Sequence, residues 1–135
     1  MELDFAFLAD SAQAVGGKLF VLGGAFDTIN APKVPVIHNT MSLAVRLLFD
    51  VSEIGRHHQL EVDIVDADGR RIARAGGPLF LEKNPHTPAG WNQGFLAVVN
   101  FINLKFEKFG DYGVKIIFNN TTIKSIPLRV IEGKK

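Results

Sequence analysis

The side chains best suited to metal or acid–base chemistry are four histidines, His38, His57, His58 and His86. His57 and His58 are adjacent, so on a strand their side chains leave opposite faces. A metal pair on a helix needs i, i+4 spacing, as in H-E-x-x-H, and the sequence has no such motif. We therefore expect these histidines at surface or turn positions, and we predict no metal site and no cofactor.

An acid–base site could still be assembled from residues that lie far apart in the sequence. Asp10, Asp27 and His38 flank the Gly23-Gly24 pair, which could bulge out of a strand and bring them together. These residues define an alternative hypothesis, a hydrolase. No nucleophile motif supports it, because G-x-S-x-G, S-x-x-K and H-x-E are all absent from the sequence. We leave enzyme activity open, expect none, and assign no catalytic residue.

Two charged clusters have structural explanations. Asp63, Asp66 and Asp68 followed by Gly69 resemble the start of a calcium loop, but arginines occupy the later positions and no acidic residue closes the loop. Asp-x-Asp-Gly is instead typical of a hairpin turn. The arginines Arg70, Arg71 and Arg74 follow, and on a regular strand Arg70 and Arg74 share one face with Arg71 opposite. We interpret them as a solvated strand edge, because charges there discourage strand-to-strand aggregation.

Trp91 is the strongest candidate for ligand binding. It is the only tryptophan, and it lies in the polar segment KNPHTPAGWNQ with His86 and Asn92 close by. An exposed aromatic ring beside amide groups can anchor a sugar ring or a partner protein, although Trp91 could equally fold back to cap the core. The ligand-binding candidates are therefore Trp91, His86 and Asn92, together with Asp27.

Composition excludes several other classes of function. The chain of 135 residues has no cysteine, which rules out disulfides, zinc thiolates and a thiol nucleophile. A net charge of +1 does not suggest a nucleic-acid or anionic membrane surface. No apolar run reaches the length of a membrane span. The opening MELDFAFLAD carries Glu2 and Asp4 where a signal peptide needs positive charge, so we expect a cytoplasmic protein.

Apolar residues recur with period two along most of the chain, which predicts strands. The clearest cases are Leu60–Val62–Ile64 and Tyr112–Val114–Ile116–Phe118. The second is followed by Asn119-Asn120-Thr121, residues that suit a tight hairpin turn. The return strand contains Pro127, which predicts that this strand lies at a sheet edge or is locally broken. Gly110-Asp111-Tyr112 resembles a tyrosine corner, in which the Tyr hydroxyl bonds to the backbone where the chain changes sheets.

The remaining segments predict further strands. The apolar run Leu19–Leu22 looks like a strand covered on both faces, interrupted by Gly23-Gly24 and resuming to Ile29 as one half of a long N-terminal hairpin. Residues 10–15, which precede it, could instead form a helical turn. Residues 41–49 fit a strand better than a helix, residues 31–35 look like a crossing connection, and Gly76-Gly77-Pro78 is expected to break the strand after Arg70. Phe95–Val99 also looks apolar on both faces.

Together these segments predict a single domain over residues 1–135. The predicted fold is all-β: an antiparallel Greek-key sandwich of about eight strands, immunoglobulin-like or related, with a barrel as the alternative.

The sequence also resembles a family of small bacterial proteins of unknown function. Members are similar to this chain in the opening MELDFAFLAD, in LFVLGG followed by Phe26-Asp27, and in scattered positions through Pro127–Val130. Where we expect tryptophan to be common in the family, this chain has Phe26. The resemblance implies no activity and supplies no catalytic residues.

The hypothesis we favour is a non-catalytic module that binds another protein or itself, such as a homodimer, because more strands look apolar on both faces than one core requires. A carbohydrate or small-ligand binder using Trp91 and the hydrolase at Asp10, Asp27 and His38 are the alternatives. A phage or virion component is a further possibility.

Overall fold

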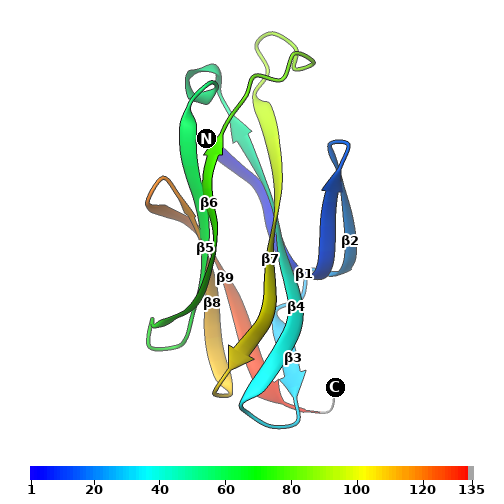
Figure 1. Ribbon diagram of the computed structural model, residues 1–135, viewed down its shortest axis with the longest axis vertical. Coiled ribbons are helices and arrows are strands. Elements are labelled where there is room, and N and C mark those ends of the chain that lie inside the picture. Colours follow the sequence, from blue (N-terminus) through cyan, green and yellow to red (C-terminus); the bar gives the residue numbers. More distant parts are fainter. Residues whose placement is uncertain (134–135) are drawn as a thin grey trace.

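A computed structural model describes residues 1–133, which form nine strands and one short 3₁₀ turn (Figure 1). The strands are β1 (Glu2–Val15), β2 (Lys18–Gly24), β3 (Thr28–Ala31), β4 (Val36–Phe49), β5 (His57–Val65), β6 (Arg71–Phe80), β7 (Gln93–Phe106), β8 (Gly110–Phe118) and β9 (Thr121–Glu132), and the 3₁₀ turn is Val51–Glu53. Within this part of the chain no helix is long and apolar enough to cross a membrane.

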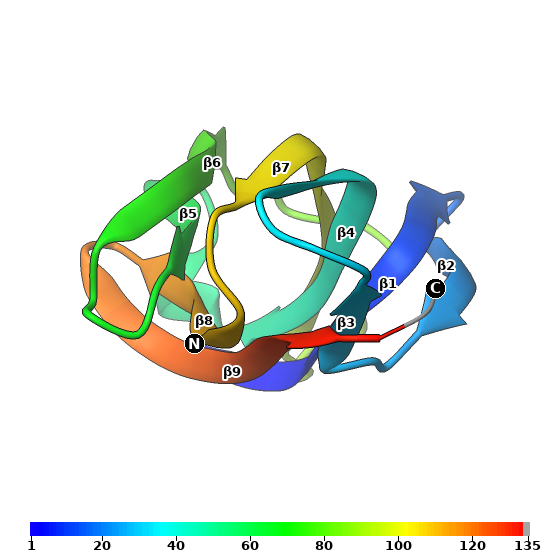
Figure 2. The same cartoon turned by 90° about the horizontal axis from the view of Figure 1, so that it is seen from below.

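The strands form two sheets that pack face to face, as the view from below shows (Figure 2). Sheet A has the order β2-β1-β4-β7, and sheet B has the order β3-β9-β8-β5-β6. Because each strand pairs only within its own sheet, the β-sandwich prediction is confirmed in preference to a closed barrel. The immunoglobulin-like assignment stays a prediction. One pair departs from the antiparallel expectation, since β3 runs parallel to β9.

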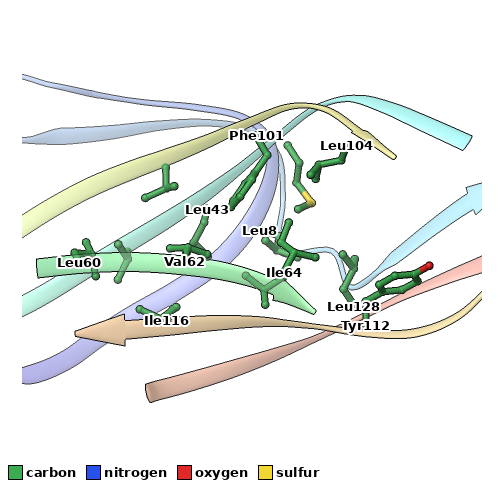
Figure 3. Close-up of a cluster of buried hydrophobic side chains, with 14 of the residues drawn as sticks. Leu8, Leu43, Leu60, Val62, Ile64, Phe101, Leu104, Tyr112, Ile116 and Leu128 are labelled. Atoms are coloured by element: carbon green, nitrogen blue, oxygen red, sulfur yellow. The ribbon is translucent and has the colours of Figure 1, made fainter. Parts of the chain in front are cut away.

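Alternating apolar residues from both sheets fill the space between the layers (Figure 3). Leu43 of sheet A and Val62, Ile64 and Ile116 of sheet B are all fully buried there. Their neighbours along each strand point to the outer faces, as period-two patterning requires. This core confirms the strands predicted from residues 41–49, 60–64 and 112–118.

Tyr112 lies where the chain passes from β7 in sheet A to β8 in sheet B. Its hydroxyl donates a hydrogen bond of 2.7 Å to the carbonyl oxygen of Lys108, and its ring packs edge-on against Phe106. Burial is the main cause that raises the pKa of the Tyr112 hydroxyl. The predicted tyrosine corner is therefore present.

The β8–β9 hairpin follows the local sequence signals. Asn119 and Asn120 both have positive φ, at 48° and 68°, the backbone geometry that two-residue hairpin loops require. β9 pairs with β3 only from Arg129 onward, so Pro127 lies where β9 has no second neighbour and needs no N–H. The prediction that Pro127 marks an edge is correct at this point of the strand.

The N-terminal predictions need two corrections. The segment read as one interrupted strand is two strands in different sheets: β2 ends at Gly24, and β3 begins at Thr28 in sheet B. Gly23 and Ala25, both at φ +63°, turn the chain between them. Residues 10–15 continue β1 as a strand, so the alternative of a helical turn is wrong. Residues 32–35 connect β3 to β4 across the two sheets, as predicted.

The third correction concerns β6, which continues through Gly76-Gly77-Pro78 without a break. Gly76 pairs with Glu61 and Pro78 with Gln59. Because β6 is the edge strand of sheet B, the missing N–H of Pro78 costs no ladder bond on its free side.

Candidate functional site

The feature that stands out from the sandwich is the distal half of the β1–β2 hairpin, residues 10–24, which we call the arm. β1 bends near Ala9: its first half pairs with β4, and its second half pairs only with β2. The arm therefore projects away from the rest of sheet A, with β2 as the outermost strand in both views (Figures 1 and 2).

The arm exposes large apolar side chains. Leu22 is 73% exposed, and Phe20 and Val15 are each 57% exposed. Phe20 and Leu22 leave the same face of β2, because they are two residues apart. The prediction that Leu19–Leu22 is covered on both faces is therefore wrong in this single chain: only the side chains of Leu19 and Val21 are half-buried.

The outer face of sheet A also carries apolar side chains. Strand pairing places Phe7, Ala44 and Val98 side by side, one residue away from the core positions Leu8, Leu43 and Val99. Alternation therefore directs these three side chains to the outer face, where Ala44 is fully buried between the half-buried Phe7 and Val98. The Phe5 and Phe7 rings stack with centroids 5.8 Å apart, and Ile102 further along β7 is 72% exposed.

The second candidate site is the loop between β6 and β7, at the upper end of the molecule in Figure 1. Gln93, which is only 4% exposed, closes the base of this loop. Its side-chain oxygen accepts a hydrogen bond of 2.9 Å from the Asn84 backbone N–H, and its amide nitrogen donates one of 2.7 Å to the Glu82 carbonyl. The sequence analysis missed Gln93, and a lone polar residue at the start of an apolar strand was the only signal.

Trp91 lies near the tip of this loop and is 68% exposed, so its ring does not cap the core. Hollows lie on both sides of the loop. One is shared with His86 and Asn92 and reaches Arg46 and the tip of the arm. The other is mainly apolar and is bounded by the 3₁₀ turn. The structure thus brings three of the four predicted ligand-binding residues together.

Asp27, the fourth, is not among the residues that line either hollow. It precedes β3, which lies in the lower half of Figure 1, away from the β6–β7 loop, and its carboxylate accepts a hydrogen bond of 2.8 Å from the Thr28 hydroxyl. Asp27 thus serves the start of β3 rather than the Trp91 site.

The residues of the hydrolase hypothesis come together only in part. Asp10 and His38 line one shallow hollow with Gly23 and Gly24. Asp27 is outside this lining and is turned toward Thr28. Among the described residues, no three histidine or acidic side chains form a group that could hold a metal ion.

The paired histidines do point to opposite faces of β5. His57 is exposed and packs against the Phe80 ring at 4.9 Å. His58 is 8% exposed, so the expectation of a surface or turn position is wrong for this residue. Its Nε2 lies 2.8 Å from the Glu53 carbonyl oxygen and its Nδ1 lies 3.0 Å from the Asn119 amide nitrogen. With the proton on Nε2 both contacts are hydrogen bonds, so His58 is a satisfied structural residue.

The acidic turn is also structural. The Asp66 carboxylate accepts hydrogen bonds from the backbone N–H groups of Asp68 and Arg70, at 3.0 and 2.8 Å. This side-chain-to-backbone pattern closes the β5–β6 hairpin and confirms the turn interpretation.

The arginine cluster differs from its predicted arrangement. Arg74 forms a two-pronged ion pair with Asp63, with N–O distances of 2.6 and 2.9 Å, and also contacts Glu61 at 3.2 Å. Arg71, rather than Arg70, shares this side, 4.0 Å from Asp63. A bulge opposite Ile64 and Val65 leaves Ile72 without a partner and shifts the register by one residue, which moves the preceding β6 side chains to the other face. These residues lie on an edge strand, as expected.

The Asp63 ion pair predicts an acid-dependent loss of stability. The Arg74 hydrogen bond is the main cause that lowers the pKa of the Asp63 carboxyl from its usual 3.8. The pair therefore stabilises the fold above that value, and its contribution is lost as the pH falls through the lowered pKa. Asp63→Asn should remove this part of the pH dependence. Urea unfolding at neutral pH and below pH 4 measures it, with the exposed Asp68→Asn as control. Equal acid sensitivity in both variants would contradict the assignment.

A family model now accounts for most of the chain: residues 4–131 match a family of unknown function, DUF6941. The chain belongs to this family. The match runs from within β1 to within β9, so the arm and the Trp91 loop are parts of the family's domain. No curated protein gives a significant match. No solved structure gives one either.

Proposed function

We propose that the chain is a non-catalytic interaction module that binds another protein chain through the arm and the adjoining outer face of sheet A. The observation that carries this proposal is the exposure of Phe20 and Leu22, at 57% and 73%, on an edge strand. The apolar sequence of β2 is typical of a strand that is covered on both faces. In the single chain, the face that carries Phe20 and Leu22 is open to solvent.

The energetics favour a protein partner. Burying one large apolar side chain that would otherwise be exposed contributes roughly 1.5–3 kcal/mol. Phe20, Leu22 and Ile102 offer three such side chains around the arm and sheet A. The free edge of β2 also offers backbone groups that an added strand can pair with. Large exposed apolar patches on folded domains commonly mark interaction sites.

Photo-cross-linking inside the cell tests this proposal. A benzophenone side chain at Leu22 should give adducts of discrete mass larger than the monomer, because the arm is covered by another chain. The matched control is Thr121, which is exposed on the β8–β9 turn of the opposite sheet. Adding Phe20→Glu should remove the Leu22 adducts by placing a charge in the contact. Adducts that are equally abundant at Leu22 and Thr121 would overturn the proposal.

A second candidate function is ligand binding at Trp91, favoured by its 68% exposure on a loop that Gln93 holds closed at its base. A rigid, exposed indole suits stacking against a sugar ring. Because Trp91 is the only tryptophan, intrinsic fluorescence reports on this site alone.

A panel of oligosaccharides should contain one that shifts the Trp91 emission, and Trp91→Ala should weaken its binding at least tenfold. Phe80→Ala, at an exposed aromatic on β6, is the control and should leave the affinity unchanged. If the panel leaves the emission unchanged, or if Trp91→Ala binds as well as the natural chain, this second function is wrong.

A further inference from the structure

We propose that the partner of the arm is a second copy of this chain, and that the two β2 strands pair antiparallel across a two-fold axis to join the two copies of sheet A. This inference rests on the proposed function and assigns it a partner and a geometry. It starts from the free edge of β2, which pairs with β1 on one side and is the last strand of sheet A on the other.

The free edge of β2 lacks the features that prevent edge strands of different molecules from pairing. Folded proteins protect edge strands with charges, prolines or covering segments. β2 has the sequence KLFVLGG, in which Lys18 is the only charged residue, and it contains no proline. Of the other edge strands, β6 has Arg71 and Arg74 as well as Pro78, β3 is only four residues long, and β7 lies against β6 where the two sheets meet. Among the described strands the four sheet edges therefore differ in their protection, and β2 is the edge left open to pairing.

Symmetry restricts how two copies of β2 can pair. Two identical antiparallel strands in one sheet are related by an axis perpendicular to the sheet, so one residue must face its own counterpart. Val21 is the midpoint of Lys18–Gly24, and placing it on the axis pairs the Phe20–Leu22 segments of the two copies before Gly23, where φ is +63°, turns each chain. Each Phe20 then faces Leu22 of the second copy, on the face where both side chains are exposed in the single chain.

The charges of the arm agree with this register. With Val21 on the axis, Lys18 faces Gly24 of the second copy, and the two lysines lie at opposite ends of the paired strands. The end that receives each lysine is acidic, because Asp10 packs against Gly23 there. Like charges are thus kept apart, and each lysine approaches the end of the arm that carries Asp10 of the other copy.

Cysteine cross-linking on the purified full chain tests the pairing. The natural chain has no cysteine, so a single Val21→Cys variant reports on one position only. Residues that face each other in antiparallel strands lie close enough for a disulfide or a short bismaleimide bridge. Ile102→Cys, exposed on the outer face of sheet A, is the matched control. Analytical ultracentrifugation of the natural chain and of Leu22→Glu measures self-association directly. Protein concentrations from about 10 to 500 µM also detect a weak dimer.

We expect the natural chain to approach twice the monomer mass at high concentration, Leu22→Glu to stay monomeric, and Val21→Cys to give a covalent dimer while Ile102→Cys does not. A dimer that cross-links through Ile102→Cys and not Val21→Cys would overturn the strand pairing and still support the proposed function. A strict monomer at the highest concentration would overturn the second copy as partner, and the cell cross-links at Leu22 would then decide the proposed function separately.

Discussion

Phe49→Ala is expected to lower the free energy of unfolding by about 3–5 kcal/mol, the usual cost of truncating a buried aromatic residue. Phe49 is fully buried at the end of β4. Its ring lies 5.6 Å from the rings of both His58 and Phe118 and 6.3 Å from that of Phe95, centroid to centroid. The substitution therefore leaves a cavity between strands of both sheets and removes aromatic contacts from a satisfied buried histidine.

Thermal unfolding should show this change as a drop of about 10–15 °C in Tm for a domain of this size. Phe80→Ala is the matched control, because Phe80 is 48% exposed on the edge strand β6, and it should cost less than about 1 kcal/mol. If the two variants lost similar stability, the packing around Phe49 would not be as described. The amide exchange of β5 in Phe49→Ala would show whether the loss reaches sheet B.

Gly76→Ala is expected to cost about 2–4 kcal/mol, from backbone strain and steric overlap together. Gly76 has φ +100°, which residues other than glycine rarely adopt. A Cβ at this position would also run into the carbonyl oxygen of Leu60 and lie 3.0 Å from the Cα of Glu61. Because both obstacles are backbone atoms of β5, the clash is relieved only by moving the paired strands apart.

The neighbouring glycine provides a matched control. A Cβ at Gly77 would meet no atom within 4 Å, so Gly77→Ala should not strain the fold. The substitution should be neutral or raise stability by about 0.4–1 kcal/mol, because alanine lowers the conformational entropy of the unfolded chain. Urea unfolding of the two variants measures the difference. Hydrogen exchange along β6 should speed up in Gly76→Ala alone, and a neutral Gly76→Ala would show that β5 and β6 are not paired in this register.

The structural features that depend on short segments were predictable from the sequence. Alternation over residues 60–64 and 112–118 identified β5 and β8, because a strand's inward positions repeat every second residue. Asn119-Asn120 identified a turn, since asparagine tolerates positive φ. Tyr112 was recognised from its position beside Gly110 and Asp111. In each case the information lies within a few residues of the element it specifies.

Features that depend on pairing between distant segments were missed. The parallel pairing of β3 with β9 joins residues about a hundred positions apart, and no local pattern distinguishes β3 from a continuation of β2. The bulge beside Val65 exchanged the faces of Arg70 and Arg71 through a one-residue register shift. His58 looked like a surface histidine because its partners, Glu53 and Asn119, come from two other segments.

The candidate sites divide in the same way. Trp91, His86 and Asn92 stay together for a local reason, because one short loop carries them. The same kind of local reading predicted that LFVL is covered on both faces, which the single chain does not show. The separation of Asp27 from this loop and the open position of the LFVL strand at the edge of sheet A both follow from long-range strand pairing. A residue's type fixes what it can bind, whereas its burial depends on which distant strands the folded chain brings beside it.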